Sequence, residues 1–64
     1  TMLNIIRLWE SGQWTAIWNL LRNATDEYVL KVQMAIAVAL DLEQAFLFAE
    51  FLDRKHLEAT TIAN

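Results

Sequence analysis

Few side chains in this sequence belong to the types that carry out catalysis. His56 is the only histidine, and the chain contains no cysteine. A nucleophile activated by a neighbouring base needs such residues in combination, and no such pair can be recognised here. The carboxylate pairs Asp26/Glu27 and Asp41/Glu43 stand where helices are expected to begin, where they complement the positive end of a helix dipole. We therefore expect no catalytic residues and no enzymatic activity.

The sequence also gives no support for a bound metal, cofactor or nucleic acid. A zinc site needs several histidine or cysteine ligands at defined spacings, and no glycine-rich phosphate-binding loop is present. The formal net charge of −3 opposes contact with nucleic acid and with an anionic membrane surface. We expect no metal, no cofactor, no nucleic acid and no membrane, and we expect the partner to be a protein.

The three tryptophans are the strongest candidates for a binding role. Trp14 and Trp18 are four residues apart and so share one face of a helix, while Trp9 lies just across a turn at Gly12. Tryptophan buries a large area in small cores, and it is also enriched at interface hot spots. A core cluster is the favoured interpretation. The alternative is a partner groove built from Trp9, Trp14 and Trp18 that docks a helix of a different protein.

The composition points to a surplus of apolar surface. Hydrophobic residues make up 56% of the chain even without its single glycine, against about 45–50% with glycine included in a typical soluble domain. A domain of this size buries only about 60% of the surface of its unfolded chain. No membrane span is expected, because the longest apolar run, 34–40, is far shorter than the roughly 20 residues required. Without a signal-peptide pattern or cysteine, we expect a cytoplasmic protein.

Residues that favour helix predominate, with no proline and one glycine. The sequence predicts an all-α domain over residues 1–64, a small bundle of three to four antiparallel helices arranged as hairpins and completed by oligomerisation. The expected helices cover residues 2–10, 13–23, 26–40 and 42–57.

Local signals define most of the expected helix ends. Gly12 suits the left-handed end of the first helix, and Ser11 is a candidate cap for the second. Thr25 is the expected cap of the third helix. The basic run 54–56 suits the negative end of the last helix dipole, so we expect that helix to end there. From Met34 on, the third helix is apolar on every side, which is typical of a buried helix.

The connection between the last two helices has two possible forms. Asp41-Leu-Glu-Gln44 has the form of a capping box, which predicts a turn at 40–41 and a new helix from Leu42. The alternative is one continuous helix over 26–58, because no glycine or proline interrupts it. In that helix, seven consecutive heptad positions are apolar: 28, 32, 35, 39, 42, 46 and 49. We favour the turn.

The phenylalanines supply the main sequence argument for self-association. Together with the neighbouring leucines they occupy nearly every side of the last helix, and one helix face cannot cover them all. We expect apolar surface from the last two helices to meet a second copy across a two-fold axis. The expected interface residues are Val32, Ile36, Phe46, Leu47, Phe48 and Phe51. Phe48→Glu or Leu47→Glu should accordingly lower association more than helicity.

One stretch of the chain resembles a known helical repeat. The segment Ala37-Val-Ala-Leu-Asp-Leu-Glu-Gln-Ala-Phe-Leu-Phe-Ala-Glu-Phe-Leu52 is similar to the middle of a tetratricopeptide-type hairpin, with Ala45 and Ala49 at its small-residue positions. Leu40 stands where that family has a turn glycine. The segment 8–17 also looks hairpin-like, at a separation of about 29 residues rather than 34. The resemblance implies stacked antiparallel helices of the α-solenoid type, used for protein binding.

Two functions follow as expectations. The first is a non-enzymatic homo-oligomerisation module, most simply a homodimer. The second is an adaptor, or a fragment of a larger helical protein, whose hydrophobic groove docks a helix of a different protein. The fragment remains an open alternative because Thr1 precedes Met2, and a piece cut from a larger assembly would expose apolar surface too.

Overall fold

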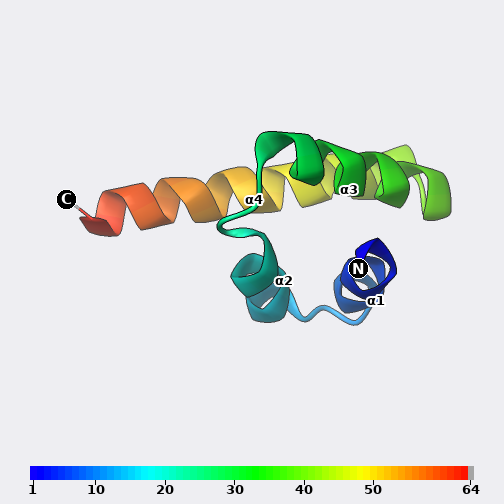
Figure 1. Cartoon of the computed structure of the whole chain (residues 1–64), viewed down its shortest axis with the longest axis horizontal. Coiled ribbons are helices and arrows are strands. Elements are labelled where there is room, and N and C mark those ends of the chain that lie inside the picture. The colour runs from blue at the N-terminus through cyan, green and yellow to red at the C-terminus, as the bar shows by residue number, and fades with distance from the viewer. Residues whose placement is uncertain (64) are drawn as a thin grey trace.

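The computed structural model describes the backbone of residues 1–63 and the side chains of residues 1–61. Four helices and no strand lie in this part of the chain, which confirms the predicted all-α fold (Figure 1). The helices are α1 (Met2–Glu10), α2 (Trp14–Leu21), α3 (Asp26–Ala39) and α4 (Leu42–Ala63). None of the described helices is long and apolar enough to cross a membrane.

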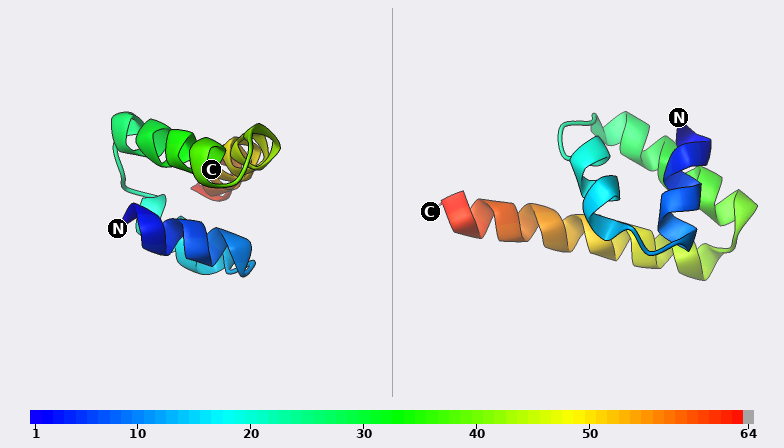
Figure 2. Two further views of the ribbon diagram at one scale, coloured as in Figure 1. Left: turned by 90° about the vertical axis from the view of Figure 1, so that its right-hand side faces the viewer. Right: turned by 90° about the horizontal axis from the view of Figure 1, so that it is seen from below.

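The helices form two layers. α3 and α4 make an antiparallel hairpin, and α1 and α2 pack together against one side of it (Figure 2). The C-terminal half of α4 extends beyond the other three helices, which gives the molecule dimensions of 37 × 19 × 18 Å. α4 is the longest helix, with 22 residues. One of its faces packs into the core, and the others are exposed to solvent.

The core lies between the two layers and draws on all four helices. Its members are aliphatic or aromatic, and no polar or charged residue in the described part is fully buried. The ten buried residues are Ile5, Ile6, Trp9, Ile17, Leu21, Val32, Ile36, Ala45, Phe48 and Leu52. Burying a leucine- or phenylalanine-sized side chain contributes about 1.5–3 kcal/mol, so this set holds the layers together.

The turn between α3 and α4 follows the favoured prediction. Leu40 leaves the helical conformation, with φ −115° and ψ −90°. The Asp41 side chain then caps α4, since its Oδ1 accepts a hydrogen bond from the Gln44 backbone N–H at 2.8 Å. The alternative of a single helix over 26–58 is therefore wrong. Thr25 caps α3 as predicted, accepting from the Tyr28 backbone N–H at 3.1 Å.

The turn between α1 and α2 was predicted only in part. Gly12 has φ +72°, the left-handed conformation expected after a helix end. Ser11 does not cap α2. It terminates α1, and its hydroxyl donates to the carbonyls of Arg7 and Leu8 at 2.9 and 3.2 Å. α2 begins after Gln13, which makes no capping hydrogen bond with its side chain.

α4 continues past the predicted end near residue 57. The basic run 54–56 does not stop it, because the following residues sustain the helix and no glycine or proline intervenes. Lys55 pairs with Glu58 one turn later at 3.7 Å, and the Thr60 hydroxyl donates to the His56 carbonyl at 3.0 Å. The basic run therefore lies inside the helix and does not mark its end, and Lys55 forms its ion pair with a residue of the next turn.

Candidate protein-binding surfaces

The six residues predicted to form one interface lie in three different places. Val32, Ile36 and Phe48 have 0% exposure and belong to the core of the single chain. Their assignment to an intermolecular interface is therefore wrong, because the residues of α1 and α2 already cover them. Phe48→Glu would place a carboxylate in this core and unfold the chain, rather than act chiefly on association.

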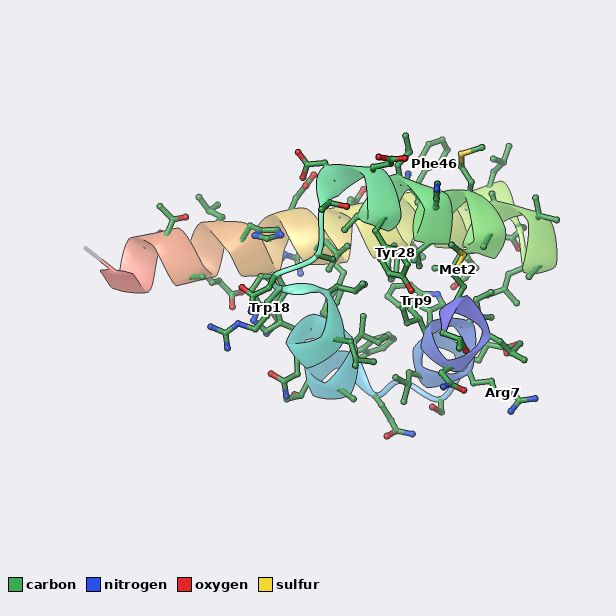
Figure 3. All side chains as sticks on the ribbon, viewed as in Figure 1. Met2, Arg7, Trp9, Trp18, Tyr28 and Phe46 are labelled. Carbon is green, nitrogen blue, oxygen red and sulfur yellow. The ribbon has the colours of Figure 1, made fainter. Side chains whose placement is uncertain are left out.

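The other three predicted residues point to two separate sides of α4. Phe46 is 62% exposed and Leu47 is 44% exposed, while Phe51 is half-buried. At about 100° per residue, Phe46 and Phe51 are about 140° apart around the helix axis. Phe51 and Leu47 lie beside the tryptophans, whereas Phe46 lies on the side of the hairpin that faces away from α1 and α2 (Figure 3). One predicted interface thus becomes two candidate surfaces.

The first surface, which we call the hairpin strip, runs along α3 and the start of α4. On α3, residues 30, 34 and 38 are four apart and point almost directly away from the buried Val32 and Ile36. On α4, Leu42 and Phe46 are also four apart, and Phe46 lies on the side of the hairpin that faces away from α1 and α2 (Figure 3). The strip consists of Leu30, Met34, Val38, Leu42 and Phe46, with exposures of 55, 61, 88, 66 and 62%.

The hairpin strip corrects the expectation that α3 is buried on every side from Met34 on. The α1–α2 layer covers only one face of α3, and nothing in the single chain covers the opposite one. The strip side chains carry no hydrogen-bonding group apart from the weakly accepting thioether of Met34. The nearest ion pair on the helix is Lys31–Glu27 at 3.6 Å, and both side chains are largely exposed. The strip is thus an apolar surface with little polar chemistry.

The second surface, which we call the aromatic groove, lies where α1 and α2 approach α4. It consists of two adjoining hollows of about 510 and 640 Å³ that share Trp9, Trp14 and Gln44. Leu47 and Phe51 line the first hollow, and the α3–α4 turn lines the second. Both hollows are wide open to solvent, so they form a shallow groove on the surface rather than an enclosed pocket.

Aromatic rings form the wall of the groove. The Trp9 and Trp14 rings meet edge to face with centroids 4.8 Å apart, and Trp14 lies 5.9 Å from Phe51. Trp9 is 7% exposed and also contacts Phe48 of the core, at 5.4 Å. Trp14 is 45% exposed. Trp9 therefore belongs to the core and supports Trp14, which presents its surface to the solvent.

A side-chain hydrogen bond fixes the floor of the groove. The Trp9 indole Nε1–H donates to Gln44 Oε1 at 2.8 Å, which links α1 to the first turn of α4. The predicted capping box is therefore only half formed. Asp41 caps the helix, but the Gln44 side chain bonds to Trp9. A buried indole N–H needs an acceptor, and Gln44 supplies it from the first turn of α4.

Trp18 does not join the other two tryptophans. Its ring meets His56 of α4 edge to face, with centroids 4.7 Å apart, and it lines neither hollow. The predicted partner groove of Trp9, Trp14 and Trp18 is therefore wrong in its third member. Trp14 and Trp18 reach α4 one turn apart, at Phe51 and His56 respectively. His56 thus contacts an aromatic ring, and no group of three potential metal ligands occurs among the described residues.

Charge is distributed unevenly along the groove. Glu10 and Asp41 line the end at the α3–α4 turn, and no base lines that hollow. The other end contains both signs: Arg54, Lys55, Glu50 and Glu58. Lys55 is paired with Glu58 at 3.7 Å, whereas Arg54 takes part in neither salt bridge seen among the described side chains. The groove therefore runs from an acidic end to an end that offers a guanidinium.

Sequence reasoning missed four of the strip residues and Gln44. The spacing of 30, 34 and 38 was visible, but apolar residues on the remaining faces of α3 concealed which face was covered. No protein-family model matches this chain, and no curated protein or solved structure shows significant similarity to it. The tetratricopeptide-like resemblance therefore stays a prediction, and function must be argued from the two surfaces.

Proposed function

We propose that this chain is a non-enzymatic homodimerisation module that pairs through the hairpin strip. The observation that carries the proposal is the row of five large apolar side chains, each more than half exposed, on one side of the α3–α4 hairpin. Contiguous exposed apolar patches mark interaction sites in soluble proteins. Covering the strip would remove five large apolar side chains from water at once.

The chemistry of the strip favours a second copy as its partner. A two-fold axis brings the same patch of both chains together, so an interface without charges meets neither like-charge repulsion nor unpaired polar groups. Phe46 and Met34 are suited to the centre of such a contact, since aromatic residues and methionine are enriched in interface cores. In the dimer each hairpin covers the strip of the other and supplies burial that a chain of this length lacks.

Two matched leucine substitutions test the proposal. Leu30 lies in the strip and Leu20 lies on α2, with exposures of 55% and 57%. Leu30→Glu should raise the dimer dissociation constant about 100-fold or more, because it places a carboxylate in an apolar contact. Leu20→Glu should leave association unchanged. Circular dichroism should show the same helicity for both variants.

Sedimentation equilibrium over a hundredfold concentration range provides the measurement. The expected result is a dimer for the wild type and for Leu20→Glu, and a monomer for Leu30→Glu. A wild-type chain that stays monomeric throughout, or equal association in both variants, contradicts the proposal.

A further inference from the structure

We infer that the aromatic groove is a docking site for an amphipathic helix of a different protein, with a basic end seated against Glu10 and Asp41. The groove is separate from the hairpin strip, so this interaction would add a second binding function to the chain. Its partner is recognised by shape, by apolar spacing and by charge.

The dimensions of the groove fit a helix of a few turns. Along α4 the lining extends from Asp41 to Glu58, which corresponds to about 26 Å at 1.5 Å per residue. The apolar lining is concentrated in the middle, at Trp14, Leu47 and Phe51. A helix with apolar residues at positions i, i+3, i+4 and i+7 presents them along one face, and that face would contact these three side chains.

Trp14 is the expected anchor of this contact. Its ring packs edge to face against Trp9 in the core, and the hydrogen bond to Gln44 fixes the Trp9 ring. A large side chain that is exposed yet rigidly supported loses little conformational freedom on binding. Tryptophan in such a position is the residue type most often found at hot spots.

The charges give the bound helix a direction. The acidic end, with Glu10 and Asp41, attracts lysine or arginine, and Arg54 at the opposite end can pair with a carboxylate. Isolated helices are stabilised by acids in their first turn and bases in their last. A partner of that kind would run antiparallel to α4, with its C-terminal turn at Asp41.

A second copy of this chain is a poorer occupant. If copies paired through the strip and also through the groove, two different self-contacts would lie on one chain, and assembly would continue beyond the dimer. The exclusion of a second copy rests on the proposed dimer. The charges at the two ends of the groove are independent of the dimer, so the two proposals can fail independently.

A designed peptide tests the inference directly. The probe is a blocked peptide of about 18 residues, or about 27 Å as a helix, with leucines along one face, glutamates in the first turn and lysines in the last. A second peptide has glutamine in place of the lysines. Calorimetric titration of the full chain should show one peptide per chain for the first probe and weaker binding, by about fivefold, for the second.

Variants of the chain locate the peptide. Trp14→Ala should weaken binding about tenfold or more. The double variant Glu10→Gln/Asp41→Asn should weaken it about fivefold at low salt, and asparagine at position 41 keeps the helix cap. The matched control Glu27→Gln/Asp53→Asn makes the same change in net charge outside the groove, and it should bind as the wild type does.

Sedimentation of the same mixtures separates the possible outcomes. Binding that depends on Trp14 and on the acidic end, with the association state unchanged, supports the inference. The inference is overturned if the lysine-bearing probe fails to bind, if both double variants lose affinity equally, or if the peptide dissociates a dimer, which would mean that a second copy occupies the groove. A monomeric wild type that still binds the peptide through Trp14 refutes the dimer alone.

Discussion

The hairpin strip and the aromatic groove are both exposed apolar surfaces to which α4 contributes, yet they differ in the polar groups around them. The strip carries no charged member, and no hydrogen bond among the described side chains involves it. The groove is built on the Trp9–Gln44 hydrogen bond and is bounded by charges at both ends. An apolar surface without charges suits a copy of itself, whereas an uneven charge distribution suits a partner with its own polarity.

The largest expected effect comes from two phenylalanines that are two residues apart. Phe48 has 0% exposure, and Phe48→Ala should lower the free energy of unfolding by about 3–5 kcal/mol. Phe46 is 62% exposed, so Phe46→Ala should barely change the stability of the monomer while weakening the dimer. Urea denaturation at a concentration where the chain is monomeric provides the comparison. Equal losses of stability would remove the distinction between core and strip.

A smaller effect is expected at the floor of the groove. Gln44→Leu removes the acceptor for the Trp9 indole N–H and should cost about 1–2 kcal/mol of stability, because that donor is part-buried. Gln33→Leu is the control, since Gln33 is also half-buried and makes no side-chain hydrogen bond among those seen in the described residues. Thermal unfolding followed by circular dichroism measures both. A Gln44→Leu variant as stable as the control would show that the hydrogen bond does not hold the floor.

The smallest expected effect is that of salt, and it separates the two surfaces. Raising sodium chloride from about 50 to about 500 mM shortens the range of charge interactions. Affinity for the lysine-bearing peptide should fall severalfold, because Glu10 and Asp41 are exposed. The dimer dissociation constant should change little or decrease. Sedimentation and calorimetry at both salt concentrations provide the test, and a dimer that dissociates in high salt would argue for charged contacts in its interface.

The four helices were predictable because their signals are local. Thr25, Asp41 and Gly12 each act on backbone groups within a few residues, and the structure has all three in the predicted roles. The roles of Ser11 and of the basic run 54–56 were predicted wrongly. A serine can bond at the start or at the end of a helix, and basic residues occur inside helices as well as at their ends. Such choices depend on the competition between neighbouring hydrogen bonds, which residue type alone does not decide.

The surfaces were less predictable because burial depends on the other layer. Val32 and Met34 are both apolar and two residues apart, and only the packing of α1 and α2 decides that one is buried and the other exposed. The Trp9–Gln44 hydrogen bond joins residues 35 positions apart, and the Gln44 side chain had a plausible local role in the capping box. Long-range partners of this kind leave no periodic signal in the sequence.

The most direct test of the central claim is to follow side-chain methyl resonances by nuclear magnetic resonance as the chain is diluted. If copies pair through the hairpin strip, the methyl groups of Leu30, Met34, Val38 and Leu42 will shift with concentration. Those of Leu47 in the groove and Leu20 on α2 will stay constant. Resonances that are all independent of concentration, or shifts centred on Leu47, would contradict dimerisation through the strip.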